Sequence, residues 1–235
     1  MRQIIIGFLI TALFGLSSVA SAQDASMSGF IDMEVTDENK VLATLPAPGD
    51  DGVMLRMIHA VRLKAGLGSN PVGLDRGWGS SGEILVFRKI GNRVLLEVEN
   101  QTYRANPDNP LEARAVAESF ANSFVGEAEI TAQEGGTVTF DLTGFLVGDS
   151  LNLVQHLKDA DQGTFTVAEK RSLVDPDNII VFPDNVEVDV FLTLSSKDPG
   201  REVATTAASG NDVTLVQHHS FVRLPEEGYT PLASD

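Results

Sequence analysis

Cysteine is absent from the 235-residue sequence. Its absence excludes disulfide bonds, thiolate nucleophiles and cysteine-based metal sites. Small secreted domains often need disulfides because they bury too little apolar surface to be stable without them. If this chain is exported, the lack of cysteine suits a bacterial envelope better than a disulfide-stapled extracellular scaffold.

Basic residues are scarce, with 17 lysines and arginines against 33 aspartates and glutamates, which gives a formal net charge of −16 at pH 7. A surface of this sign repels nucleic acid and anionic lipid headgroups. The composition therefore predicts no nucleic-acid partner. Such a surface would attract divalent cations or basic proteins, although acidity more often serves solubility.

Long apolar runs are limited to the N-terminus. Arg2 precedes an apolar run from Ile4 to Leu16, which is shorter than the roughly 20 residues that a membrane span needs. The segment Ala20-Ser21-Ala22 then offers the small residues that signal peptidase prefers. We therefore expect residues 1–22 to be a signal peptide cleaved after Ala22. The remaining protein is expected to be periplasmic or secreted, with no membrane span.

Most of the chain after residue 22 carries strand signals. Several runs are rich in Val, Ile, Leu, Phe and Thr and are bounded by turn residues. These predicted strands are 54–63, 83–90, 93–100, 137–142, 185–195 and 213–224. Gly91-Asn92 and Glu134-Gly135-Gly136 each separate two such runs, which is the pattern of a β-hairpin.

One medium-length helix is expected after residue 109. Asn109 can cap it, and Pro110 suits its first position. Val116, Phe120 and Phe124 follow at intervals of four residues, which predicts a stripe that faces the core.

A shorter helix is expected at about 150–158, starting from Asp149 and burying Leu151, Val154 and Leu157. With two helices among many strands, the sequence predicts an α+β fold dominated by antiparallel β-sheet with hairpins.

The domain organisation follows from the spread of these elements. We expect residues 23–39 to be a lead-in segment, within a region 23–52 that holds one or two strands. Residues 40–231 should form a single β-rich domain, because no long linker divides them. Residues 198–212 are expected to be an exposed loop.

The segment "AGLGSNPVGLDRGWGSSGE", residues 65–83, concentrates six glycines around Asp75-Arg76. Its spacing is neither G-x-G-x-x-G nor a P-loop, and a strand follows it, so it is a poor phosphate-binding loop. Its spacing alone favours a long structural connection in which Asp75 and Arg76 tie the loop to itself. The alternative is that this charge pair belongs to an interaction surface.

Three segments together resemble one protein family. They are residues 65–77 ("AGLGSNPVGLDRG"), 94–124 ("VLLEVENQTYRANPDNPLEARAVAESFANSF") and 216–231 ("VQHHSFVRLPEEGYTP"). This order resembles the uncharacterised domain that precedes the catalytic domain of bacterial exported zinc-dependent metalloproteases of the metzincin type. The resemblance runs from roughly Lys40 to Pro231.

The catalytic signature of that protease family is missing from this chain. Metzincins bind zinc through H-E-x-x-H-x-x-G-x-x-H, and this sequence has no His-Glu dipeptide. The resemblance therefore implies a non-catalytic accessory domain, with no cofactor in this chain and zinc only in a catalytic domain outside it. Residues 232–235 would begin the region that follows.

The resemblance also implies partners, namely the metalloprotease catalytic domain, in cis or from a split gene, and a protein or peptide substrate. One alternative is a free-standing periplasmic β-rich binding module. Another is an enzyme with its own unrecognised site, which the missing motifs disfavour.

Four histidines, His59, His156, His218 and His219, are the other candidates for chemistry. His218 and His219 should point to opposite faces of the predicted strand 213–224, so they are poorly placed to share a metal ion. They remain candidates for interaction. No pairing of His59 or His156 follows from the sequence.

Other isolated motifs are weak. Ser119 and Ser220 lie in no G-x-S-x-G motif. Asp175, Asp177 and Asn178 lack the spacing of a calcium loop and are better explained as a turn.

Overall fold

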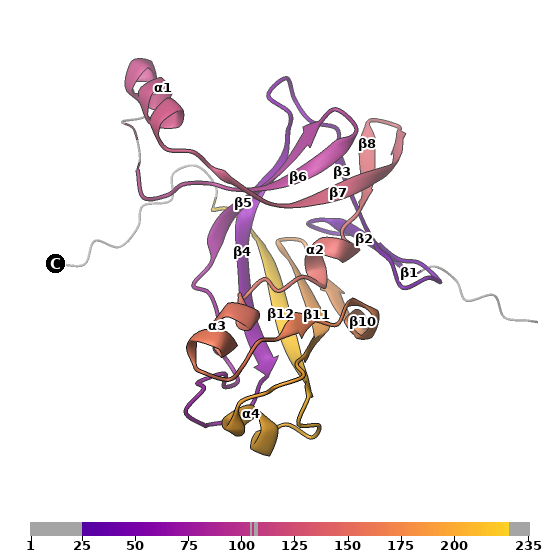
Figure 1. The fold of residues 1–235 in the computed structure, drawn as a ribbon. Coiled ribbons are helices and arrows are strands. Elements are labelled where there is room, and N and C mark those ends of the chain that lie inside the picture. The colour runs from indigo at the N-terminus through magenta and orange to yellow at the C-terminus, as the bar shows by residue number, and fades with distance from the viewer. Residues whose placement is uncertain (1–24, 104, 106–107, 226–235) are drawn as a thin grey trace, which may run out of the picture.

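The computed structural model describes residues 25–103, 105 and 108–225, which form a single curled antiparallel β-sheet (Figure 1). Its strands are β1 (Ala25–Met27), β2 (Asp32–Val35), β3 (Val41–Pro46), β4 (Val53–Ala65), β5 (Glu83–Ile90), β6 (Arg93–Val98), β7 (Ser123–Glu134), β8 (Thr137–Asp141), β9 (Thr166–Val167), β10 (Leu173–Val181), β11 (Asn185–Ser195) and β12 (Asp212–Arg223). The expected signal peptide, its cleavage site after Ala22 and residues 226–235 lie outside the described residues.

The sheet has the strand order β1-β2-β3-β8-β7-β6-β5-β4-β12-β11-β10, and β9 pairs separately with β11. It curls into a half-barrel, which brings its two ends together at one point. There the amide of Phe30 donates a hydrogen bond to the carbonyl of Phe182 over 2.8 Å. Gly29 permits this approach, because a Cβ at that position would lie 2.6 Å from the same carbonyl oxygen.

Both predicted hairpins are confirmed. Ile90 pairs with Arg93 across Gly91-Asn92, and Glu134 pairs with Thr137 across two glycines. Gly135 and Gly136 have φ angles of 60° and 83°, the left-handed values that a tight type I′ turn requires. Local turn chemistry was therefore sufficient to fix these connections.

The predicted α+β class is wrong. Strands make up 47% of the structure and helices only 15%, and the helices do not form a layer of their own. They are α1 (Pro110–Ser119), α2 (Thr143–Leu146), α3 (Leu153–Asp159) and α4 (Arg201–Thr206), with a 3₁₀ turn η1 (Glu169–Arg171). Most are one or two turns long, so the sheet supplies most of the core. Within the described residues, no helix is long and apolar enough to cross a membrane.

The core-facing stripe predicted on the first helix is also wrong. Asn109 caps α1 as expected, accepting a hydrogen bond from the Glu112 amide at 3.3 Å. However, the helix ends at Ser119, and Phe124 lies in β7 with 59% of its surface exposed. No residue of α1, all of which the structure describes, is buried. The residues at four-residue intervals therefore lie on both sides of the end of α1, and they do not share one face of a helix.

The shorter helix is largely as predicted. The Asp149 carboxylate accepts hydrogen bonds from the first amides of α3, at 2.7 Å from Leu153 and 2.9 Å from Val154. Leu153 and Leu157 are fully buried, whereas Leu151 and Val154 are only partly buried. Residues 198–212 are not a plain loop, because they contain α4.

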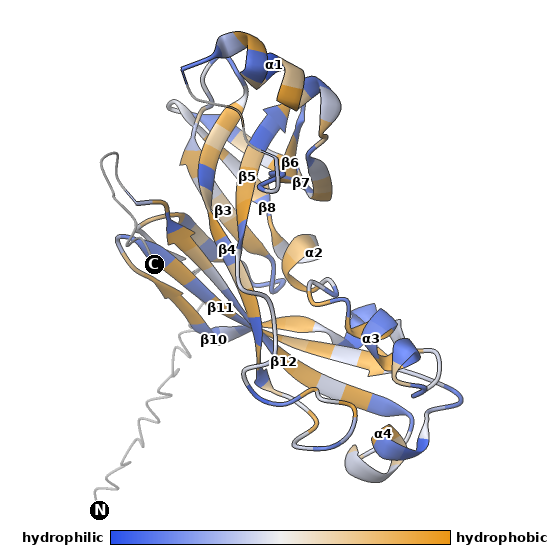
Figure 2. Cartoon of the chain, turned by 90° about the vertical axis from the view of Figure 1, so that its left-hand side faces the viewer, coloured by the Kyte–Doolittle hydropathy of each residue, from blue (hydrophilic) through white to orange (hydrophobic). Residues whose placement is uncertain are grey.

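The core consists of two apolar clusters. The larger cluster fills the concave side of the half-barrel and is built around Phe87, Phe140 and Phe221. The second lies at the far ends of β4, β11 and β12, where α3, α4 and the glycine-rich loop cover the sheet (Figure 1). Hydropathy along the strands alternates accordingly (Figure 2). The region 23–52 holds three strands, against the one or two expected, and its residues Ile31 and Met33 belong to the larger cluster.

Candidate functional site

The central strand β12 presents its two adjacent histidines to opposite faces of the sheet. His219 is completely buried on the concave face, whereas the His218 side chain is 38% exposed on the convex face. This geometry is the alternation that the sequence predicted for a strand. The two imidazoles therefore have separate environments and separate partners.

On the concave face, His219 pairs with a histidine that sequence reasoning could not connect to it. His59 on β4 lies diagonally across from His219, and its Nε2 is 3.2 Å from Nδ1 of His219. His59 also stacks on Phe221, its direct cross-strand neighbour, with ring centroids 4.8 Å apart. The signal that could have found this pair is the β4–β12 register, which the sequence alone does not provide.

The histidine pair belongs to a polar seam between the two apolar clusters. Gln217, two residues before His219, is completely buried and donates from Nε2 to the carbonyl of Gly148 at 2.9 Å. Among the described residues, Oε1 of Gln217 and Nε2 of His219 have no hydrogen-bond partner. Buried polar atoms without partners are costly, so a protein seldom keeps them where only packing is needed.

Burial lowers the pKa of His219 well below its ordinary value, and the neighbouring His59 and His218 lower it further. The nearby Leu146 carbonyl acts in the opposite direction but does not compensate. His219 is therefore neutral at pH 7. Its contribution to stability is present above about pH 6.5 and is lost as the pH falls. Below that pH the unfolded chain binds a proton at this histidine that the folded chain does not bind, so the free energy of unfolding decreases.

A cleft of about 720 Å³ opens beside His59. It lies where β4, β5 and the start of β7 meet the segment that contains α2 and leads to α3. Its lining residues are His59, Val61, Ser80, Glu83, Val125, Gly126, Glu127, Gly144, Phe145, Gly148, Asp149 and Ser150. Three acidic side chains thus surround a partly apolar floor, and His59 is the buried polar group that reaches it.

On the convex face, His218 binds two carboxylates at once. Its Nδ1 lies 2.7 Å from Oδ1 of Asp189, and its Nε2 lies 2.8 Å from Oε2 of Glu187. Asp189 is almost fully buried and also pairs with Lys64. We call His218, Glu187, Asp189, Lys64 and Ser220 the outer polar cluster.

Hydrogen bonding to Glu187 is the main cause that raises the pKa of His218, and Asp189 raises it further against the effect of burial. Burial works to raise the pKa of Glu187, but hydrogen bonds from His218, Ser220 and Asn185 outweigh it and lower that pKa. The His218 contribution to stability is therefore present below about pH 6.5 and is lost as the pH rises through its raised pKa.

The outer polar cluster does not form a serine nucleophile. The Ser220 hydroxyl donates to Glu187, and both nitrogens of His218 are engaged by carboxylates. A serine protease-like relay would need the histidine to accept the serine proton. The cluster is instead a fixed set of ion pairs across β4, β11 and β12.

The glycine-rich loop has a defined conformation, but its charge pair does not anchor it. Arg76 is exposed and Asp75 is half-buried, and neither side chain forms a hydrogen bond or ion pair within the described part of the chain. The loop is held by Leu67, Val72 and Leu74, which are buried in the second apolar cluster. Asp75 and Arg76 are thus left available at the surface.

His156 connects this loop to α3. Its Nε2 lies 2.7 Å from the carbonyl of Val72, and its ring packs against Trp78 with centroids 4.8 Å apart. His156 therefore has a structural role beside the second apolar cluster.

Comparison with known proteins identifies the family. The chain belongs to the family described as a domain of unknown function (DUF5117), which matches residues 78–235. No curated protein and no solved structure matches the chain. The matched region contains β5 to β12 and therefore His218 and His219, whereas β4 with His59 lies before it.

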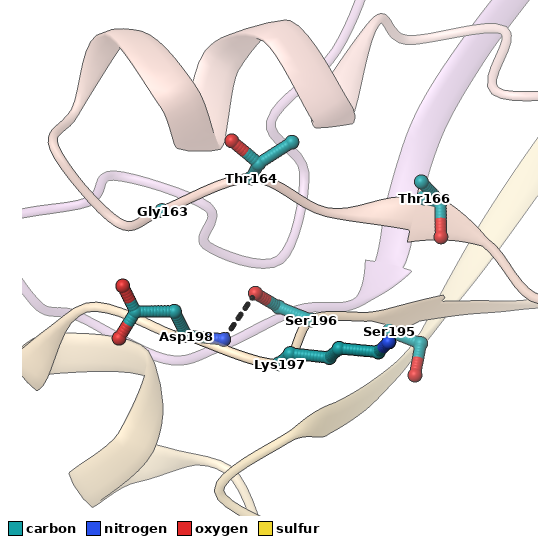
Figure 3. Close-up of a pocket in the computed structure, with 7 residues that line it drawn as sticks. All are labelled: Gly163, Thr164, Thr166, Ser195, Ser196, Lys197 and Asp198. Atoms are coloured by element: carbon teal, nitrogen blue, oxygen red, sulfur yellow. Dashed lines mark hydrogen bonds between the residues drawn. The ribbon is translucent and has the colours of Figure 1, made fainter.

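A second, more open pocket of about 470 Å³ lies at the far end of β11 (Figure 3). Gly163, Thr164 and Thr166 form one wall, and residues 195–198 form the other. The Ser196 hydroxyl accepts a hydrogen bond from the Asp198 amide at 3.2 Å. No buried polar atom without a partner is found among the residues that line it, so the cleft at His59 is the stronger candidate.

Asp175, Asp177 and Asn178, which the sequence assigned to a turn, lie within strand β10 in the structure. Asp175 accepts hydrogen bonds from the Asp177 amide and from the Asn178 side chain, at 3.2 and 2.8 Å. These residues bulge out of β10. Over the described residues, no group of three or more histidines and acidic residues has the geometry to hold a metal ion.

Proposed function

We propose that this chain is a non-catalytic accessory domain of an exported, periplasmic or secreted zinc-dependent metalloprotease, which supports or orients the catalytic domain and contacts substrate. Two features of the sequence support this proposal. Three ordered segments resemble that domain, and the chain has no H-E-x-x-H motif with which to bind catalytic zinc.

An exposed apolar arm is the main structural support for docking to a catalytic domain. Helix α1 projects from one end of the half-barrel (Figure 1), and Leu111 on it is 77% exposed. At its base, Tyr103 stacks on Phe120 with ring centroids 3.7 Å apart, and Phe124 and Val125 are exposed. Large exposed apolar side chains on a projecting element favour a protein–protein interface.

The test is association with a metalloprotease catalytic domain encoded in the same or the adjacent reading frame. We expect the purified chain to bind that domain, and Leu111→Glu to weaken binding at least about tenfold because a charge replaces an apolar contact. Ile180→Glu is the matched control, since Ile180 is 48% exposed on β10, far along the sheet from α1. Binding measured by calorimetry should be unchanged in this control.

Two results would contradict the proposal. One is equal binding by the Leu111→Glu variant, which would place the interface elsewhere. The other is casein hydrolysis by the chain alone that a chelator abolishes and zinc restores. The alternative function, a free-standing binding module, is favoured by the cleft at His59 and would be supported if no H-E-x-x-H sequence is encoded downstream.

A further inference from the structure

Strand β10 forms one border of the sheet, and part of its outer edge is unprotected. In the described part of the chain β10 pairs only with β11, whereas the opposite border is β1, a strand of three residues. Edge strands usually avoid pairing with other chains through charge, proline, a bulge or short length. The first half of β10 has such protection, because Asp175, Pro176 and Asp177 bulge out of it. The second half, from Ile179 to Val181, has neither charge nor proline.

The backbone groups that face away from the sheet are those of Ile179 and Val181. The Phe182 amide donates to the Asn185 carbonyl at 2.8 Å, and alternate residues of an antiparallel strand bond to the same neighbour. Phe182 and Ile180 therefore bond to β11, whereas the amides and carbonyls of Ile179 and Val181 point outward. Among the described residues, these outward groups have no hydrogen-bond partner.

The outer face of the sheet beside this edge is apolar. Ile180 lies opposite Glu187 of the outer polar cluster, so its side chain points to the same convex face. Ile180 and Phe182 expose 48% and 44% of their surfaces. From Asn178 to Phe182 the sequence has no charged residue, in a chain with a net charge of −16. A partner for this edge must therefore bring an extended, apolar strand.

Strand β10 of a second copy meets this requirement. Antiparallel pairing about a twofold axis at Ile180 places Ile179 of each copy opposite Val181 of the other. Both residues then exchange amide–carbonyl hydrogen bonds, so the outward groups of this stretch are all satisfied. An axis at Ile179 would instead place Val181 opposite Asp177 in the bulge. An axis at Val181 would place Ile179 opposite Pro183, which has no amide hydrogen.

We propose that this protein forms a weak homodimer in which the two β10 strands pair antiparallel about Ile180. The two Ile180 side chains lie directly opposite each other on the convex face, in the non-hydrogen-bonded position where side chains approach most closely. The contact from Phe30 is at Phe182, beyond the residues that exchange hydrogen bonds, and is kept in each copy. This dimer goes beyond the proposed function and is independent of docking at α1.

The test is sedimentation velocity of the purified protein between about 10 μM and about 1 mM, at low and at high salt. We expect a monomer–dimer equilibrium that salt strengthens, because salt screens the repulsion between two acidic chains. Ile180→Glu and Ile180→Lys should each weaken the dimer at least about tenfold, since like charges would face each other across the axis. An equimolar mixture of the two variants should dimerise more strongly than either alone, because Glu then faces Lys.

Leu111→Glu is the matched control, because it adds the same charge at an exposed apolar position on α1. It should dimerise as the wild type does. A wild-type protein that stays monomeric over the whole range would overturn the proposed dimer and leave the edge to an extended segment of another protein. Undiminished dimerisation of Ile180→Glu, or loss of the dimer in Leu111→Glu, would place the interface elsewhere. A mixture of the two Ile180 variants that stays monomeric would contradict an axis at this residue.

Discussion

Replacing Gly66 with alanine should destabilise the protein by about 3 kcal/mol or more, at the upper end of the range for overpacking. A Cβ at Gly66 would overlap the carbonyl oxygen of Leu74 in the same loop. That carbonyl accepts a hydrogen bond from the Leu67 amide at 2.8 Å, so it cannot move without breaking the loop. Urea unfolding followed by circular dichroism measures the effect.

Gly144→Ala is the control for this substitution. Gly144 lies in α2, and a Cβ there meets no atom within 4 Å. We expect its free energy of unfolding to stay within about 0.5 kcal/mol of the wild-type value. Equal stability of the two variants would mean that residues 66–74 move freely and do not hold the fixed conformation described above.

Phe87→Ala should cost about 4 kcal/mol, as expected for the loss of a fully buried aromatic side chain. Phe87 is completely buried on β5, 5.4 Å from the Phe140 ring and 6.5 Å from the Phe221 ring, between centroids. These three residues come from β5, β8 and β12, so the substitution tests whether the curled sheet encloses one core.

Phe124→Ala is the contrast, because the four-residue spacing predicted a buried position and the structure exposes it. We expect a change within about 0.5 kcal/mol, measured by thermal unfolding of both variants. A larger loss from Phe124→Ala than from Phe87→Ala would contradict the observed packing and restore the predicted core-facing helix.

The strands were predictable because their pattern is local. The predicted limits of β5 and β11 coincide with the observed ones, and the limits of β4 and β12 differ by one or two residues. In each case turn residues bound an apolar run. Pairing with the neighbouring strands leaves these limits almost unchanged. The predicted stripe on α1 failed because periodicity alone cannot show that the chain leaves the helix at Phe120.

The candidate site was predictable only in part. Alternation along β12 placed His218 and His219 on opposite faces, but their partners come from other strands. His59 and His219 are separated by 160 residues, and only the β4–β12 register brings them together. The partners of His218, Glu187 and Asp189, depend in the same way on the β11–β12 register. Register is set by the whole sheet, which no local pattern encodes.

The two faces of β12 are compared most directly by long-range ¹H–¹⁵N NMR of the histidine side chains from about pH 5 to about pH 9. Because both of its nitrogens contact carboxylates, His218 should carry hydrogen on both at pH 6.5 and should lose one only above this ordinary pKa. His219 should be neutral at pH 7 and should stay neutral below pH 6.5. Protonation of His219 near pH 6.5, or a neutral His218 at that pH, would contradict the environments described for the two faces.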